Sequence, residues 1–265
     1  MTIYVGVGGW IFEPWRGTFY PDKLPQKREL EYAATKLTTI EINGTYYGSQ
    51  KPESFTKWHD ETPDDFVFSL KAPRFSTNRR ILTDGAPTIE RFFQSGITNL
   101  KSKLGPINWQ FPTTKKFDAK DFEGFLKLLP KTLNGVALKH AVEVRHESFA
   151  HPDFVALARE HGAAIVLAGD SEYPQIADLT APFIYARIMG TERTEPLGYS
   201  PAALDEWAAR GKTLAEGKVP ADLATVAPHK SVSKPDVYLY VISGYKEKNP
   251  AAARALIERL TSSTK

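Results

Sequence analysis

The stretch Ala141-Val142-Glu143-Val144-Arg145-His146 decides how the rest of the chain is interpreted. Its apolar and polar residues alternate strictly, and a period of two is typical of a β-strand. The two valines then face one side of the strand, while Glu143 and Arg145 face the other. A similar segment, Thr39-Ile40-Glu41-Ile42-Asn43, also carries a glutamate and a second polar residue on one face. We therefore interpret Glu41 and Glu143 as the anchors of one polar site.

Length and composition indicate an ordinary globular protein. The chain has 265 residues, which is close to the length of about 250 typical of one (β/α)₈ barrel, and we expect a single domain over residues 1–265. A net charge of +3 is too small to indicate nucleic acid by itself. The chain has no cysteine, which excludes disulfides, thiolate metal sites and a cysteine nucleophile. No signal peptide or apolar run of about 20 residues is evident, so we expect a soluble, cytoplasmic protein without a membrane span.

Eight strand-like segments alternate with helical patterns, and hairpin signals are nearly absent. This alternation is typical of βαβ units that build a parallel sheet. The expected strands are Ile3–Val7, Thr38–Asn43, Phe66–Lys71, Pro106–Phe111, Ala141–His146, Ala163–Ala168, Phe183–Met189 and Val237–Ser243. The expected helices are Glu29–Lys36, Pro52–Asp60, Thr88–Lys103, Ala119–Leu129, Asp153–His161, Pro201–Glu216 and Pro250–Leu260.

Polar residues near the carboxyl ends of these strands favour a closed barrel over an open, doubly wound sheet. An open sheet gathers ligand groups from the few strands beside its switch point, whereas a barrel gathers them from all strands at one mouth. The polar residues are Glu41, Asn43, Ser69, Lys71, Gln110, Glu143, Arg145, Asp170, Arg187 and Ser243. The sequence therefore predicts an α/β fold, a single (β/α)₈ TIM-type barrel with parallel strands.

A series of motifs in chain order points to a known family. The motifs are Gly8-Gly9-Trp10 with Trp15, Gly17 and Phe19-Tyr20-Pro21; Ile40-Glu41-Ile42-Asn43 with Tyr46-Tyr47; Trp58; Phe66-Val67-Phe68 with Lys71; Gln110-Phe111-Pro112; and Glu143-Val144-Arg145-His146. Together they resemble the YecE-like family, a domain of unknown function, over essentially the whole chain. The resemblance implies a TIM barrel with a pocket at the carboxyl ends of its strands. It implies no established reaction, since fold does not fix function.

Two positions depart from the pattern of that family. Relatives usually have Arg-x-His-Gly after the seventh strand, whereas this chain has Arg187-Ile188-Met189-Gly190. The eighth strand usually ends in asparagines, whereas this one ends in Ile242-Ser243-Gly244. Two polar groups of the mouth are therefore missing, which indicates a divergent subgroup and leaves a non-catalytic scaffold barrel as one alternative.

Glu41 and Glu143 have two interpretations. Paired carboxylates in unlike environments can divide the roles of general acid and general base, so both residues are candidate catalytic groups. The alternative is a buried ion-pair network with Arg145, Lys71 or Arg187, because a barrel interior cannot leave charges unpaired.

The cations of the mouth predict an anionic ligand. Arg145 and Arg187 have planar forks that suit phosphate or carboxylate groups, and Lys71 adds a third positive charge. We expect a metal-independent hydrolase or lyase that acts on a small anionic or phosphorylated sugar-like substrate. The expected substrate-binding residues are Trp10, Asn43, Tyr46, Lys71, Gln110, Arg145, Asp170 and Arg187.

A metal site and a nucleic-acid site are the remaining alternatives. His146 follows Arg145 and so faces away from Glu143, and no metal-ligand spacing or dinucleotide fingerprint is present, so we expect neither metal nor cofactor. Aromatic residues with nearby arginines could stack bases, which keeps nucleic-acid binding or processing as a second function. Packing of the loops would explain the same residues. They are Trp10, Phe12, Trp15, Tyr46, Tyr47, Phe75, Arg74, Arg79 and Arg80.

Overall fold

Eight parallel strands close into a barrel in the order β1-β10-β9-β8-β7-β4-β3-β2. This is seen in a computed structural model that describes residues 1–262. The predicted TIM-type barrel is confirmed, and each predicted strand contributes to it. The strands are β1 (Ile3–Gly8), β2 (Thr39–Ile42), β3 (Val67–Lys71), β4 (Leu104–Gln110), β7 (His140–Glu143), β8 (Ala164–Gly169), β9 (Phe183–Ile188) and β10 (Asp236–Val241). The opening stretch is shorter than predicted, because β7 ends at Glu143.

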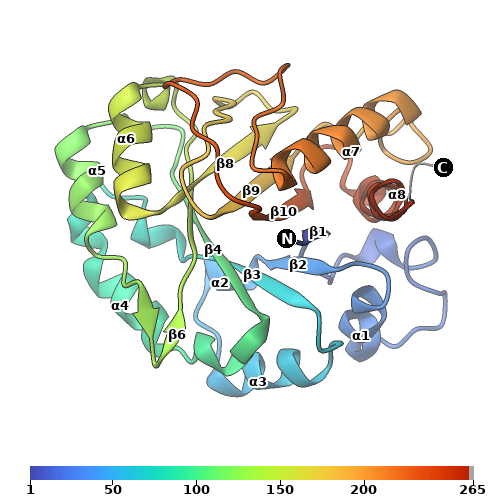
Figure 1. The fold of residues 1–265 in the computed structure, drawn as a ribbon. Helices are drawn as coiled ribbons and strands as arrows, with labels where there is room; N and C mark the ends of the chain where they lie inside the picture. The colour runs from blue at the N-terminus through green and yellow to red at the C-terminus, as the bar shows by residue number, and fades with distance from the viewer. Residues whose placement is uncertain (263–265) are drawn as a thin grey trace.

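Helices cover the outside of the barrel (Figure 1). Proline begins several of them, where a missing N–H costs nothing; Pro152 and Pro201 each follow a capping side chain, from His151 and Ser200. The helix that starts at Pro152 ends before Gly162, which has a left-handed φ of 67°. The helices are α1 (Glu29–Ala34), α2 (Gly44–Tyr47), α3 (Pro52–Asp60), α4 (Ala86–Gln94), α5 (Ala119–Leu126), α6 (Pro152–His161), α7 (Pro201–Ala215) and α8 (Asn249–Thr261).

Two helical predictions differ from the structure. The predicted helix over Thr88–Lys103 is broken, because Gly96 adopts a φ of 91° and the chain continues as 3₁₀ turns over Ile97–Lys103. The short helix α2 was expected to be a loop. In the part of the chain that the structure describes, no helix separates β8 from β9. Each helix within residues 1–262 is too short or too polar to cross a membrane.

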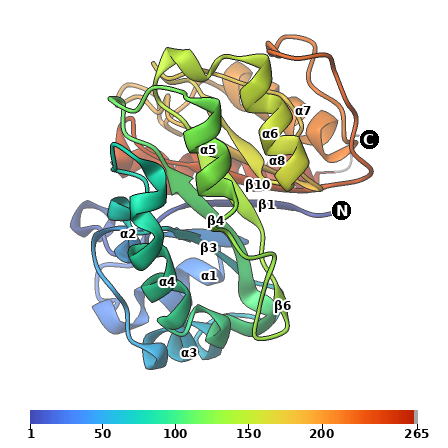
Figure 2. The ribbon, with the colours of Figure 1, turned by 90° about the vertical axis from the view of Figure 1, so that its left-hand side faces the viewer.

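A small hairpin was also missed. Asn134 and Gly135 join β5 (Thr132–Leu133) to β6 (Val136–Ala137), with φ of 50° and 79°. Positive φ at both central residues is the signature of a type I′ turn, for which Asn-Gly is a strong signal. The hairpin precedes β7, so it lies at the end of the barrel opposite the mouth. Figure 2 shows β6 on the side of the N-terminus and α2 on the other side.

Strand alternation divides the buried residues into two layers. The outer layer, between strands and helices, is apolar and aromatic and includes Trp109 and Phe125. The inner layer, inside the barrel, combines small residues with tyrosines. Tyr240 shares hydrogen bonds with Thr39 and Ser69 deep in the interior, where the Tyr240–Thr39 oxygen distance is 2.8 Å. The interior therefore accommodates polar groups below the mouth, as buried hydroxyls require partners.

Candidate functional site

The parallel register brings the predicted polar residues to one level of the barrel. Glu41 of β2 lies beside Ser69 of β3. Gln110 of β4 lies beside Glu143 of β7. Arg187 is the next-to-last residue of β9. Because all strands run in the same direction, these side chains meet at the carboxyl ends, as expected for a barrel.

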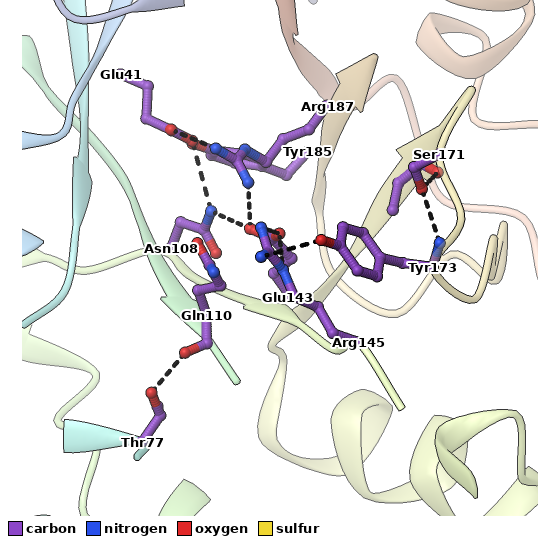
Figure 3. Close-up of polar contacts among 11 residues, drawn as sticks. Glu41, Thr77, Asn108, Gln110, Glu143, Arg145, Ser171, Tyr173, Tyr185 and Arg187 are labelled. Carbon is purple, nitrogen blue, oxygen red and sulfur yellow. Dashed lines mark hydrogen bonds and ion pairs between the residues drawn. The ribbon is translucent and has the colours of Figure 1, made fainter. Parts of the chain in front are cut away.

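Arg187 joins the two glutamates. One guanidinium nitrogen (Nη1) lies 2.6 Å from Glu143 Oε2, and the other (Nη2) lies 3.0 Å from Glu41 Oε1 (Figure 3). Both carboxylates are fully buried, and Arg187 is 4% exposed. The predicted meeting of Glu41 and Glu143 at one site is therefore present, with an arginine between them.

Two neutral residues complete the contacts of the glutamates. Tyr185 donates its hydroxyl proton to Glu41 Oε2 at 2.6 Å. The Asn108 amide donates to Glu143 Oε2 at 3.0 Å and makes a longer contact of 3.4 Å with Glu41 Oε2. These partners satisfy buried carboxylate oxygens, which is the condition for leaving a charge inside a protein.

The surrounding charges keep Glu143 ionised. Burial alone would raise the pKa of Glu143, but the positive charges of Arg187, Arg145 and Lys71 outweigh burial and lower its pKa to about 2. Burial likewise opposes the charge of Arg187, yet Glu143 and Glu41 raise the pKa of Arg187 above its usual range. A carboxylate with so low a pKa is a poor proton carrier near neutral pH, because catalytic pKa values lie near the working pH.

Arg145 extends the network toward solvent. Its Nε and Nη2 atoms donate to Glu143 Oε1 at 3.0 and 2.8 Å. The guanidinium also lies over the Tyr173 ring, 4.4 Å from its centroid, and Nη1 is 3.4 Å from the Tyr173 hydroxyl oxygen. This two-point pairing fixes the plane of Arg145 and leaves one edge toward the mouth.

Lys71 differs from the two arginines. Among the described residues, no ion pair or hydrogen bond engages its ammonium group, which lies 4.2 Å from the centre of the Tyr46 ring. Only 7% of the residue is exposed. Burial, assisted by the charge of Arg187, lowers the pKa of Lys71 to about 8, although Glu41 and Glu143 oppose the shift.

A cavity of about 490 Å³ lies above this network at the barrel mouth. Gln110 faces the cavity, is 8% exposed, and its Oε1 atom has no hydrogen-bond partner. Neither Glu41 nor Glu143 lines the cavity, since both lie beneath the cations. The lining residues are Gly8, Asn43, Tyr46, Tyr47, Lys71, Gln110, Arg145, Arg187, Ile242, Ser243, Lys246 and Asn249. A space of this size fits a small metabolite.

Two smaller hollows flank the cavity. One, of about 330 Å³, contains Trp10 and Trp58 and shares Gly8, Asn43 and Lys246 with the central cavity. The shared residues make the two spaces neighbours, so Trp10 borders the mouth without lining its centre.

The other hollow, of about 250 Å³, shares Tyr46 and Tyr47 with the central cavity and continues to Phe75 and Arg79. The mouth therefore adjoins two smaller hollows, which also share Gln50 with each other and both carry aromatic side chains.

Asp170 and His146 lie outside the cavity. Asp170 accepts a hydrogen bond of 2.7 Å from Trp207 Nε1 and lines a separate hollow beside Tyr199. Its backbone adopts a left-handed φ of 52° directly after β8. His146 accepts a hydrogen bond from the Ser148 backbone N–H. Within residues 1–262, no group of three or more His, Asp or Glu side chains is placed to hold a metal ion.

Three residues of the network were not singled out from the sequence. Asn108 and Tyr185 face inward because they lie two residues before Gln110 and Arg187 on the same strands. That alternation could have found both of them. Tyr173 lies on the loop after β8, where no periodic signal exists.

Comparisons with known proteins identify the family of the chain and relatives with the same fold. Residues 4–265 match the family described as "Protein of unknown function DUF72". The chain belongs to this family. The UPF0759 protein YunF of Bacillus subtilis is 26% identical over 158 residues, which cover 57% of this chain and 54% of YunF. The UPF0759 protein YecE of Escherichia coli K12 is 28% identical over 150 residues, which cover 56% of this chain and 50% of YecE. The chain thus spans about half the length of the curated relatives it matches.

Solved DUF72 structures share the fold. A DUF72 family protein of Thermotoga maritima has a TM-score of 0.71 and 23% identity, with 97% of each chain covered. One from Enterococcus faecalis has a TM-score of 0.71 and 17% identity, covering 100% of this chain and 97% of the other. A "xylose isomerase-like TIM barrel/4-hydroxyphenylpyruvate dioxygenase fusion protein" has a TM-score of 0.55 and 13% identity, covering 98% of this chain and 43% of the other. These likenesses show the fold alone.

The predicted YecE-like resemblance is confirmed. Met189, where the resemblance implied a histidine, is buried with the apolar residues of the barrel interior. Ser243, where the resemblance implied an asparagine, lines the central cavity and has a φ of 55°.

Proposed function

We propose that this DUF72 protein is an enzyme that binds a small anionic, phosphorylated sugar-like substrate at the barrel mouth. It would act on that substrate as a hydrolase or lyase without a metal ion. The observation that carries the proposal is the charge balance beneath the cavity. Lys71, Arg145 and Arg187 supply three positive charges against the two negative charges of Glu41 and Glu143, and Lys246 adds a further positive charge to the lining, so the cavity borders an excess of positive charge.

The hydrogen-bond partners of the arginines support separate roles for the arginines and the glutamates. Arg187 and Arg145 are oriented by the glutamates, so they present donors in fixed positions, which is how preorganised sites stabilise charge. Gln110 lines the same space, and its unpartnered Oε1 atom could accept a hydrogen bond from a hydroxyl group of the substrate. The oxygens of Glu41 and Glu143 are engaged by arginine, amide and hydroxyl donors, which leaves them unsuited to bind a metal.

The proposal gives Glu41 and Glu143 a positioning role in place of acid–base catalysis. The sequence left two interpretations of Glu41 and Glu143 open, a general acid and base or a buried ion-pair network. Their complete burial beneath the arginines, and the low pKa of Glu143, give the acid–base role no support in this arrangement. We assign both glutamates to positioning Arg187 and Arg145.

Ligand-dependent thermal stability tests the proposal. We expect inorganic phosphate and a panel of triose and pentose phosphates to raise the melting temperature, since a ligand at about 100 times its Kd adds about 2.7 kcal/mol. Arg145→Ala should lose most of this shift, whereas Arg28→Ala should keep it, because Arg28 pairs with Glu31 on the surface. Turnover of the stabilising compounds is then followed by NMR. Equal shifts in both variants, or no shift in the wild-type protein, contradict the proposal.

A second function is favoured by the exposed rings beside the mouth. Tyr47 is 74% exposed and Phe75 is 47% exposed, and Arg74 and Arg79 lie over the Phe75 ring at 4.6 and 5.9 Å. Aromatic platforms flanked by cations can stack the bases of single-stranded nucleic acid. Salt-dependent retention on single-stranded DNA or RNA that is lost in the Arg79→Ala/Arg80→Ala double variant would support this function over the first.

A further inference from the structure

We propose that Lys71 is a covalent catalytic residue, whose Nζ atom forms an imine with an aldehyde or ketone carbonyl of the bound anion. This inference rests on the proposed function, because it needs a small anionic substrate in the same cavity. It narrows that function to a lyase whose substrate carries both a carbonyl group and a phosphate or carboxylate.

The position of Lys71 is the first support. It ends β3, so its side chain enters the mouth from the rim of the barrel, and it lines the central cavity. The two arginines of the site are held by carboxylates, whereas the more deeply buried of the two lysines, Lys71, has no carboxylate partner among the described residues. A buried ammonium without a partner is costly, which points to a use other than stability.

A second buried lysine shows what a structural role looks like. Lys103 is 3% exposed, and its Nζ donates to the backbone oxygens of His59 and Thr62 at 2.5 and 2.7 Å. Protein oxygens thus satisfy its ammonium. Lys71 has comparable burial and none of these acceptors, so its free nitrogen is available to a ligand.

The surroundings of Lys71 also favour its reactive form. An amine attacks a carbonyl only when neutral, and desolvation beside another cation is a known means of supplying neutral lysine. With a pKa of about 8, about one tenth of Lys71 is neutral at pH 7. The groups that act on it are Arg187 and Arg145, which favour the neutral form, and Glu41 and Glu143, which oppose it. The Tyr46 ring, 4.2 Å away, also favours the charged form.

The cavity defines the substrate class. Its volume of about 490 Å³ admits a molecule with few carbon atoms and one anionic group. Arg145 and the half-buried Lys246 line the same space and can bind the anion. The carbonyl must then lie within bonding reach of Lys71 Nζ while the anion meets those cations.

The proposed step balances without any oxidant or reductant. Lys71 Nζ forms a bond to the carbonyl carbon, and one of its protons moves to the carbonyl oxygen. A further proton, from solvent or from the Tyr46 hydroxyl, lets that oxygen leave as water and leaves a protonated imine. The positive imine can accept the electron pair of an adjacent C–C or C–H bond, which is the basis of cleavage, and water reverses the attachment.

Borohydride trapping tests the inference on the intact protein. The protein is incubated with glyceraldehyde 3-phosphate, dihydroxyacetone phosphate or pyruvate, then reduced and digested for mass spectrometry. We expect the peptide that contains Lys71 to gain the mass of the carbonyl compound less one oxygen. Lys71→Arg should lose this adduct, whereas Lys116→Arg, at an exposed lysine, should retain it. The trapping rate of the wild-type protein should rise as the pH increases through about 8.

The outcomes separate the two proposals. If inorganic phosphate raises the melting temperature but no carbonyl compound labels Lys71, the imine is overturned and the anion site stands. If neither occurs, both are overturned. Labelling spread over exposed lysines, unchanged in Lys71→Arg, also overturns the imine. The peptide map of the wild-type protein decides the question even if the variant does not fold.

Discussion

The two ends of the barrel handle buried positive charge in opposite ways. At the end of the barrel opposite the mouth, Lys103 directly precedes β4. Backbone oxygens of His59 and Thr62 accept hydrogen bonds from its ammonium group. At the mouth, Lys71 is almost as deeply buried but faces a cavity, an aromatic ring and two arginines. Burial alone therefore does not define the role of a lysine. The two lysines differ in whether protein oxygens accept hydrogen bonds from the ammonium group, and this difference underlies the ligand-binding role proposed for Lys71.

The largest effect is expected where charges are fully paired. Arg187→Met removes the cation between Glu41 and Glu143 and leaves two buried carboxylates short of partners. Breaking such a pair costs about 4 kcal/mol of the free energy of unfolding. Chemical denaturation at pH 7 measures the loss, and Arg28→Met, at an exposed pair, should change little. Equal stability of the two variants would show that the mouth network is not paired as described.

Acid should lower the free energy of unfolding by disrupting the ion pairs of the mouth. The folded pKa of Glu143 is about 2 and its usual value is 4.5, so the unfolded chain binds the extra proton first as the pH falls. The stabilisation that ionised Glu143 contributes is complete above about pH 4.5 and is lost between pH 4.5 and pH 2. It amounts to about 3 kcal/mol of the free energy of unfolding. Denaturation curves at pH 6, 4 and 3 measure this loss. Glu143→Gln should flatten the dependence, and an unchanged slope would contradict the assignment.

Removing the structural lysine tests the opposite end. Lys103→Met leaves the carbonyl oxygens of His59 and Thr62 without their charged donor. Hydrogen bonds to charged groups contribute roughly 1.5 to 3 kcal/mol, so we expect a loss of about 2 kcal/mol in the free energy of unfolding. Phosphate binding at the mouth, measured by thermal shift, should be unaffected. If Lys103→Met lost phosphate binding without losing stability, the structural role of Lys103 would be contradicted.

The smallest effect has the opposite sign. The folded pKa of Lys71, about 8, lies below its usual 10.5, so the unfolded chain binds more protons between these values. Stability therefore rises with pH over that interval, and Lys71→Met should stabilise the protein by roughly 1 to 2 kcal/mol below pH 8. The Tyr46 ring offsets part of the cost of burying the charge. Denaturation at pH 7 and at pH 10 measures the gain, which should shrink at the higher pH.

Sequence patterns predicted the barrel because each strand is a short, apolar or alternating run bounded by turn residues. They failed where one local signal was weak. Gly96 breaks the helical pattern of residues 88–103, and the Asn134-Gly135 turn joins strands of only two residues each. Strands that short carry no periodicity, so only the turn itself could have revealed them.

Alternation also predicted which side chains point into the barrel, including Glu41, Glu143 and Arg187. The ion-pair interpretation named Arg145, Lys71 and Arg187 as partners of the glutamates, but alternation could not decide among them, because distances around a closed ring depend on register and twist. Arg187 reaches both glutamates, whereas Lys71 reaches neither, and no pattern in the chain distinguishes the two cations. Asp170 was placed at the mouth for its position after a strand, but its backbone conformation directs it elsewhere.

The hairpin of β5 and β6 has a practical consequence. Its tip, Asn134 and Gly135, is exposed and lies at the end of the barrel away from the cavity. Exposed tips of this kind accept inserted sequence with little loss of stability. A fluorophore or an affinity handle built into this turn would report on the protein, or immobilise it, with the mouth left open to whatever compounds are offered.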